Sequence, residues 1–301
     1  MGIDIGGTKI STGVITASGD VLERAQAPTP ARLGPSRVLQ EAIQIAATLL
    51  DGREISAVGV GAAGVIDPET GRVTSATDTI TDWAGTDIAH AMREAFGVEV
   101  VVRNDAHAHA VGEAVFGAGA GHSTVLLVAA GTGIGGALVV DGSPLIGAHG
   151  AAGHLGHIPS QEADGLRCSC GILGHVEAIS SGPGLARLYR HLGGGADTAS
   201  APDVLRRVKD DPVARHAVTL SAHALGAAIG GLVNVADPGV VVIAGGLQDA
   251  GDPWWRPLLQ GVRSTALPAL ASVPVVPAAL GQDAAIIGAA TIAIRLRRPQ
   301  C

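Results

Sequence analysis

Residues 149–180 contain histidine, cysteine and glutamate side chains that could converge on one metal ion and one small polar ligand. A C-x-C pair lies there on a glycine-rich turn, with one histidine shortly after the pair and others before it. Zinc in structural sites takes four nitrogen or sulfur ligands in a tetrahedron. The sequence therefore predicts a structural zinc site, whose ligands we expect to be His157, Cys168, Cys170 and His175.

His154 and Glu177 lie in the same segment but outside this ligand set, so we expect them to face a small polar substrate. The alternative interpretation is a surface loop that happens to contain histidine and cysteine. We favour the metal site, because two of the three cysteines in the chain fall within this turn.

A second group of residues is typical of phosphate binding. An apolar strand at the start of the chain leads into a glycine-rich turn, and the residues of interest are Asp4, Gly6, Gly7, Thr8 and Lys9. Glycine leaves backbone N–H groups open to a phosphate, while the threonine and the lysine add a hydroxyl and a cation. The aspartate can hold Mg²⁺ directly or through water. The alternative is an ordinary hairpin turn.

A related turn with Gly131, Thr132 and Gly133 follows a second apolar strand. Two such tips favour phosphate binding and predict one nucleotide held by both. We reject a dinucleotide-binding interpretation, because this glycine spacing lies between two strands and does not open a helix. Gly245 and Gly246 end another apolar strand, where they either let a flat ring approach the backbone or form an ordinary strand-to-helix turn.

Asn104 and Asp105 lie where a strand ends and a helix begins, which is where α/β folds gather ligands. A carboxylate there can accept the proton of a hydroxyl nucleophile, and the neighbouring amide can position that hydroxyl. The alternative is a helix N-cap, for which Asn and Asp are favoured. We favour Asp105 as a general base, because two phosphate-type turns and a metal turn accompany it.

The elements that position these residues follow a degenerate repeat. Residues 2–21 and 125–146 each read as an apolar strand, a glycine-threonine tip, a second strand and a glycine-aspartate turn. Elsewhere we expect helices at 36–51, 86–97, 201–235 and 283–298, a helix after 104, and strands at 56–61, 98–103, 240–246 and 273–280. Alternation of this kind implies mainly parallel sheets.

The repeat therefore predicts two related α/β domains. We expect residues 1–105 plus 284–301 to form a small N-terminal domain, and residues 106–283 to form a large domain with the zinc-binding turn.

Composition excludes several classes of partner. The chain has 301 residues, of which 47% are hydrophobic, so it can bury a sizeable core. The net charge of −7 is spread without blocks, so neither nucleic acid nor an anionic membrane is attracted by bulk charge. We find no signal peptide and no uninterrupted apolar run of about 18 residues. We expect a cytoplasmic protein.

Taken together, the motifs resemble those of the ROK family of sugar kinases and sugar-responsive repressors, over essentially the whole chain. The matching segments are D-I-G-G-T-K at 4–9, N-D-A at 104–106, G-T-G-I-G-G at 131–136, H-L-G-H at 154–157 and C-S-C-G-I-L-G-H-V-E at 168–177. The resemblance implies a two-domain actin-like ATPase fold of the ribonuclease-H type, with nucleotide and sugar in the interdomain cleft.

The resemblance also implies transfer of the γ-phosphoryl group from ATP, with Mg²⁺, to the 6-hydroxyl of a hexose or N-acylhexosamine. Asp105 is then the catalytic base. The expected sugar-binding residues are Gly64, Asn104, His154, His157 and Glu177. A homodimer or homotetramer is expected as well.

Three departures from the family pattern affect the predicted specificity. His175 replaces a third cysteine, and imidazole also suits zinc. T-I-T-D-W at 79–83 replaces the usual N-L-P-G-W. His154 replaces the Glu of E-x-G-H, as in bacterial N-acetylmannosamine kinases, so N-acetylmannosamine is the expected substrate.

Two alternatives are a glucokinase of relaxed specificity and a non-catalytic sugar-sensing regulator. Family regulators carry a helix-turn-helix ahead of the first strand, whereas this sequence opens directly in that strand. The kinase is therefore the favoured hypothesis.

Overall fold

The computed structural model describes residues 1–195, 197 and 200–297. The chain forms two compact units, which we call unit 1 and unit 2. Unit 1 comprises Met1–Ser123, Ala137–Gly153 and Ala279–Cys301, of which 298–301 lie outside the described residues, and unit 2 comprises Thr124–Gly136 and His154–Ala278. The domain boundaries drawn from the sequence, after 105 and before 284, stay a prediction.

The first sheet lies in unit 1 and has the strand order β3-β2-β1-β4-β7. Its strands are β1 (Gly2–Ile5), β2 (Lys9–Ile15), β3 (Val21–Pro28), β4 (Ala57–Ala62) and β7 (Glu99–Asn104). The first three pair antiparallel as a meander, whereas β1, β4 and β7 pair in parallel. A small separate hairpin is formed by β5 (Val65–Ile66) and β6 (Val73–Ser75).

The second sheet has the order β10-β9-β8-β11-β12. Its strands are β8 (Thr124–Ala130), β9 (Ile134–Val140), β10 (Ser143–Pro144), β11 (Val240–Ala244) and β12 (Val275–Pro277). When each sheet's strands are counted in chain order, both sheets follow the order third, second, first, fourth, fifth. The repeat predicted from the sequence is thus confirmed as two sheets of one topology.

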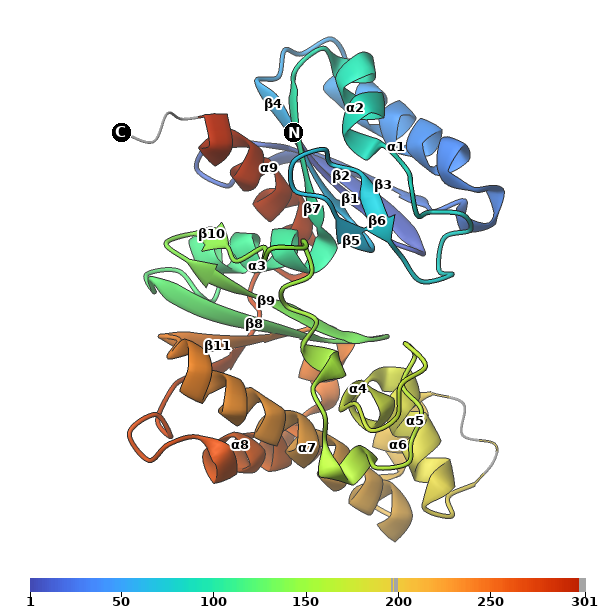
Figure 1. Ribbon diagram of the computed structural model, residues 1–301, viewed down its shortest axis with the longest axis vertical. Coiled ribbons are helices and arrows are strands. Elements are labelled where there is room, and N and C mark those ends of the chain that lie inside the picture. The colour runs from blue at the N-terminus through green and yellow to red at the C-terminus, as the bar shows by residue number, and fades with distance from the viewer. Residues whose placement is uncertain (196, 198–199, 298–301) are drawn as a thin grey trace. The chain divides into compact units, whose positions relative to one another are not determined.

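Four of the five expected helical segments each contain one helix, with ends that differ by a few residues, whereas 201–235 is divided into two helices. The helices at 177–180, 182–191 and 252–265 were not expected. In chain order the helices are α1 (Pro35–Leu50), α2 (Ile88–Phe96), α3 (Asp105–Phe116), α4 (Glu177–Ser180), α5 (Gly182–His191), α6 (Ala201–Arg207), α7 (Pro212–Ala236), α8 (Asp252–Thr265) and α9 (Ala284–Arg297). Figure 1 shows α1 and α2 on one side of the first sheet and α9 on the other, and α7 and α8 beside the second sheet.

Helix α9 packs tightly against the first sheet because glycines face it. A Cβ atom added at Gly2 would lie 1.8 Å from the carbonyl oxygen of Ile286, and one added at Gly59 would lie 1.8 Å from that of Ala289. No side chain fits at such distances, so only glycine lets the helix backbone approach the strands this closely. The expectation that the 283–298 helix folds onto the first domain is confirmed for its described residues.

One helix among the described residues, α7, is long and apolar enough to cross a membrane by length and composition. Half of its apolar window is buried, and it packs along α8. A core helix of a folded domain has these same properties.

Candidate functional site

The turn between β1 and β2 is the first of the two predicted phosphate-binding hairpins. The Gly6 N–H donates to the carbonyl oxygen of Lys9 at 3.0 Å and closes the turn, while Thr29 Oγ1 donates to the Gly6 carbonyl at 2.7 Å. Thr8 is exposed at the tip. The Lys9 ammonium donates to Gln282 Oε1 at 3.1 Å, so it is held beside the hairpin in unit 1.

Asp4 lies on β1 between two fully buried isoleucines, so its side chain points to the opposite face of the strand. Burial raises the pKa of Asp4 to about 7, and the nearby charge of Asp105 adds to the rise while Lys9 opposes it. A carboxylate in such a place is poorly solvated, so a bound cation would stabilise its ionised form.

The structure assigns one of the two roles that the sequence left open, that of the helix cap. The Asn104 side chain is the N-cap of α3, because its Oδ1 accepts the Ala106 N–H at 2.9 Å, and its Nδ2 donates to the carbonyl oxygen of Gly64 at 2.9 Å. Asp105 is the first residue of the helix. Its carboxylate also accepts the Ala106 N–H at 2.9 Å, at the positive end of the helix dipole.

Strand register brings Asp4 and Asp105 together within unit 1. Asp4 on β1 lies beside Gly61 on β4, and the next residue of β4, Ala62, lies beside Asn104 on β7. A Cβ atom added at Gly61 would lie 3.6 Å from Asp4 Oδ1 and 3.5 Å from the Asp105 Cα. Two acidic residues from distant parts of the sequence therefore converge over one glycine.

The second predicted phosphate hairpin, between β8 and β9, is held on both sides of its base by hydrogen bonds to other residues of unit 2. The Gly131 N–H donates to the Gly133 carbonyl at 3.0 Å, and the Gly182 N–H donates to the Gly131 carbonyl at 2.7 Å. On the β9 side, the Ile134 N–H donates to Glu177 Oε2 at 2.8 Å. Thr132 and Gly133 are exposed at the tip.

Gly245 and Gly246 lie where β11 ends and a short 3-10 turn (Gly246–Ala250) begins. Gly245 has a φ of +87°, and a Cβ atom there would lie 2.4 Å from the carbonyl oxygen of Ala130. The position therefore requires glycine, both for its backbone conformation and for the close contact with β8. Gly246 is exposed, so its backbone is open to a ligand.

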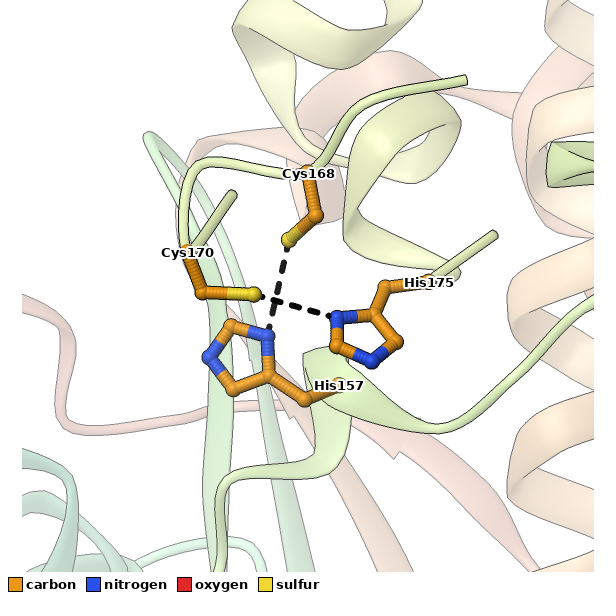
Figure 2. A group of neighbouring side chains, drawn as sticks. All are labelled: His157, Cys168, Cys170 and His175. Carbon is orange, nitrogen blue, oxygen red and sulfur yellow. Dashed lines mark hydrogen bonds between the residues drawn. The ribbon is translucent and has the colours of Figure 1, made fainter. Parts of the chain in front are cut away.

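The predicted metal ligands come together in unit 2, as Figure 2 shows. Cys168 Sγ lies 3.5 Å from His157 Nδ1, and Cys170 Sγ lies 3.3 Å from His175 Nδ1. The four ligand atoms all lie within 4.8 Å of one another. Backbone hydrogen bonds shape the turn, including one from the Cys168 N–H to the Ile172 carbonyl at 2.9 Å.

This geometry fits a tetrahedral ion. With metal bonds of about 2.3 Å to sulfur and about 2.0 Å to nitrogen, a tetrahedron separates sulfur from nitrogen by about 3.5 Å. Burial lowers the pKa of His157, which favours the neutral imidazole that a metal needs. Burial also raises the pKa of the Cys168 thiol, so a bound cation would be needed to keep it as a thiolate.

The two residues of this segment that were expected to face a substrate lie next to the ligand cluster. His154 is exposed, and its ring stacks near that of His157 with centroids 6.0 Å apart. Glu177 is buried at the start of α4, and its Oε1 accepts hydrogen bonds from Ser169 Oγ and from Cys168 Sγ. His154 is thus placed to meet solvent or a ligand, whereas Glu177 is tied into the turn.

Sequence reasoning missed Glu113, a fully buried carboxylate on α3. It accepts the backbone N–H groups of Ala118 at 2.9 Å, Ala279 at 3.0 Å and Leu280 at 2.7 Å. It therefore fixes the segment where the chain returns to unit 1. The only signal in the sequence was an acidic residue within the apolar second half of the helix.

Comparison with known proteins identifies the family. The two sheets of one topology define the class as a two-domain actin-like α/β fold of the ribonuclease-H type. The ROK family model matches residues 1–296. The chain therefore belongs to the ROK family.

Three relatives illustrate the match. A glucokinase of Thermotoga maritima is 31% identical, with 97% of this chain and 96% of the relative covered. An N-acetyl-D-glucosamine kinase of Erwinia tasmaniensis is 31% identical, with 89% and 90% covered. The structure of a ROK family glucokinase from Streptomyces griseus in complex with glucose and AMPPNP is 30% identical, with 98% of each chain covered and a TM-score of 0.81.

Proposed function

We propose that this protein is an ATP-dependent sugar kinase that phosphorylates the 6-hydroxyl of a hexose or N-acylhexosamine. The observation that carries the proposal is the convergence of Asp4 and Asp105 over Gly61, next to the glycine-threonine hairpin. The Asp4 carboxylate is suited to binding a cation, and the Asp105 carboxylate is suited to accepting the proton of a hydroxyl group. The names of the relatives, and the glucose and AMPPNP bound in one of them, support the same class of reaction.

In this mechanism unit 1 supplies the base and part of the phosphate site. Asp105 accepts the proton of the sugar hydroxyl while the oxygen of that hydroxyl forms a bond to the γ-phosphorus of ATP. The bond between the γ-phosphorus and the bridging β-phosphate oxygen breaks, and ADP is released. Asn104 and Gly64, joined by a hydrogen bond, orient the sugar. Mg²⁺, when bound, neutralises charge on the phosphates, and Asp4 would hold it.

Unit 2 supplies the second hairpin, Gly131, Thr132 and Gly133, for the phosphates and Gly245 with Gly246 for the nucleotide. His154, His157 and Glu177 contact the sugar in this proposal. A cytoplasmic location and a homodimer or homotetramer stay predictions.

The direct test is a coupled assay of ADP release with ATP and a panel of N-acetylmannosamine, N-acetylglucosamine, mannose and glucose. We expect one of these sugars to give a kcat/KM well above the others. Protein that binds neither ATP nor any sugar, and turns over none of them, contradicts the proposal. A chain that binds sugar but never releases ADP is instead a sugar-sensing regulator.

We propose zinc as the ion held by His157, Cys168, Cys170 and His175, because two sulfur and two nitrogen ligands in a tetrahedron suit it. Purified protein should contain one zinc per chain by mass spectrometry. Substitution Cys170→Ser should weaken zinc binding by more than about a hundredfold, since even outer residues of such sites are worth 10–100-fold. It should also lower the melting temperature.

Substitution Cys301→Ser is the matched control, because it makes the same chemical change at the one cysteine that is not among the proposed ligands. That variant should keep its zinc and its melting temperature. Full zinc occupancy in the Cys170→Ser variant would contradict the ligand assignment.

We propose N-acetylmannosamine as the first substrate, because His154 is exposed beside His157 and replaces the glutamate of the family pattern. Substitution His154→Glu should then change the ratio of kcat/KM for N-acetylmannosamine to that for glucose by about 5–150-fold, as expected for about 1–3 kcal/mol from one polar contact. The assay panel above measures the ratio directly.

The exposed His122 offers a matched control, and substitution His122→Glu should leave the ratio unchanged. Glucose is the second candidate substrate, favoured by the relatives that are named glucokinase. If glucose is the substrate, the His154→Glu variant should prefer the same sugars as the wild type.

A further inference from the structure

The metal-binding turn and the second hairpin are in direct contact within unit 2, and Glu177 joins them. Its Oε1 accepts a hydrogen bond from the Ser169 hydroxyl on the turn and lies 3.5 Å from Cys168 Sγ. Its Oε2 accepts the Ile134 N–H at 2.8 Å, at the end of the hairpin. One buried carboxylate therefore bridges the two loops with both of its oxygens.

Other backbone contacts hold the hairpin against the same segment. A Cβ atom added at Gly156, beside the ligand His157, would lie 2.4 Å from the carbonyl oxygen of Ile134 and 3.1 Å from the Glu177 Cβ. Glu177 thus bonds to the N–H of Ile134, and the Gly156 backbone packs against the C=O of the same residue. The Gly182 N–H, just after α4, fixes the other side of the hairpin through the Gly131 carbonyl at 2.7 Å.

We propose that Glu177 is a positioning residue through which the occupied metal turn fixes the shape of the hairpin at 131–134, and that Ser169 holds its carboxylate in place. The inference rests on the proposed function, in which this hairpin binds the phosphates of ATP. It gives Glu177 a second role besides sugar contact. The bound ion fixes the turn, the turn fixes the carboxylate, and the carboxylate fixes the hairpin before any nucleotide arrives.

A hairpin that is already ordered loses less conformational entropy when it binds a ligand. Release of the carboxylate should therefore weaken nucleotide binding even in the absence of sugar. A residue that only contacts sugar would affect sugar affinity and leave nucleotide binding alone. Nucleotide affinity without sugar is therefore the measurement that separates the two roles.

The experiment compares three variants by calorimetric titration with AMPPNP and Mg²⁺, without sugar. Substitution Glu177→Ala removes the acceptor of the Ile134 N–H, and we expect the dissociation constant to rise by about tenfold or more. Substitution Glu177→Gln keeps an oxygen for that N–H, so it should restore affinity to within about threefold of the wild type. Substitution Ser169→Ala should cause a rise of about two- to tenfold.

The matched control is Ser160→Ala, because the Ser160 hydroxyl also donates to a carboxylate in this segment, that of Glu162 at 2.6 Å. This variant should bind AMPPNP like the wild type. Equal nucleotide affinity in the wild type and the Glu177→Ala variant would overturn the inference, even if sugar binding is lost.

A second measurement does not depend on catalysis. Hydrogen exchange at the Ile134 amide should accelerate by about tenfold or more in the Glu177→Ala variant, and also in wild-type protein stripped of zinc by a chelator, because that amide loses its acceptor. An unchanged exchange rate of the Ile134 amide in both the Glu177→Ala variant and the zinc-free wild type would overturn the inference. If the wild type binds no nucleotide at all while exchange responds as expected, the proposed function fails and the link between the two loops stands.

Discussion

Substitution Asp105→Asn is expected to reduce kcat by about 10²–10⁴-fold, the usual contribution of a general base. An amide cannot take up the proton of the sugar hydroxyl, yet it has nearly the same shape as the carboxylate. Asn104 keeps its role as the cap of α3, because its own Oδ1 accepts the Ala106 N–H, and an asparagine at 105 keeps an oxygen for the same N–H. The variant should therefore fold and bind both substrates. Steady-state assays with saturating ATP and sugar, alongside calorimetric titrations, measure both properties.

The matched control is Asp87→Asn, which makes the same change at the start of another helix of unit 1. Asp87 Oδ1 accepts the His90 N–H at 3.0 Å as the N-cap of α2, and asparagine can replace it there. Its kcat should equal that of the wild type. A kcat of the Asp105→Asn variant within tenfold of the wild type would show that another group takes the proton.

Substitution Asp4→Asn is expected to stabilise the protein while it removes activity. The pKa of Asp4 is raised from 3.8 in the unfolded chain to about 7 in the fold, chiefly by burial, so the folded protein holds a proton that the unfolded chain releases. Stability is then lost as the pH rises from about 4 to 7, and it stays lost above that. The full shift corresponds to about 4 kcal/mol, and we expect about half of this because the side chain keeps some contact with water.

The free energy of unfolding of the Asp4→Asn variant should therefore exceed that of the wild type. The difference should grow between pH 5 and pH 7 and then level off. Chemical denaturation across pH 5–9 measures this difference. Substitution Asp51→Asn, at the exposed C-cap of α1 in the same unit, is the control and should show no such growth. An Asp4→Asn variant less stable than the wild type at pH 8 would show that Asp4 has a stabilising partner when ionised.

Much of the fold could be predicted because the repeat is local. Each copy of the strand–tip–strand pattern lies within about twenty residues, and both sheets then follow the same order. The metal turn was equally accessible, since its four ligands lie between 157 and 175 and their residue types alone restrict the ion. The cap and base interpretations of Asn104 and Asp105 competed in the sequence, and the structure gives the cap to Asn104.

Other features depend on partners that are remote in sequence, and no local pattern indicates them. Glu113 accepts hydrogen bonds from the backbone N–H groups of residues 279 and 280, which lie more than 160 positions away in the sequence. Glu177 is joined to Ile134 by a contact that spans 43 positions. Residue types predict which side chains can bind such groups, but only the folded chain determines which ones meet.

The glycine-mediated packing of α9 on the first sheet has a consequence for how the protein is made. A ribosome releases β1 and β4 long before residues 284–297 have been translated, and all of unit 2 after Gly153 emerges in between. Until then no α9 is present to cover the surface of the sheet around Gly2 and Gly59. The nascent first sheet therefore stays incomplete while unit 2 is being synthesised, and α9 can complete it only after residues 284–297 have left the ribosome.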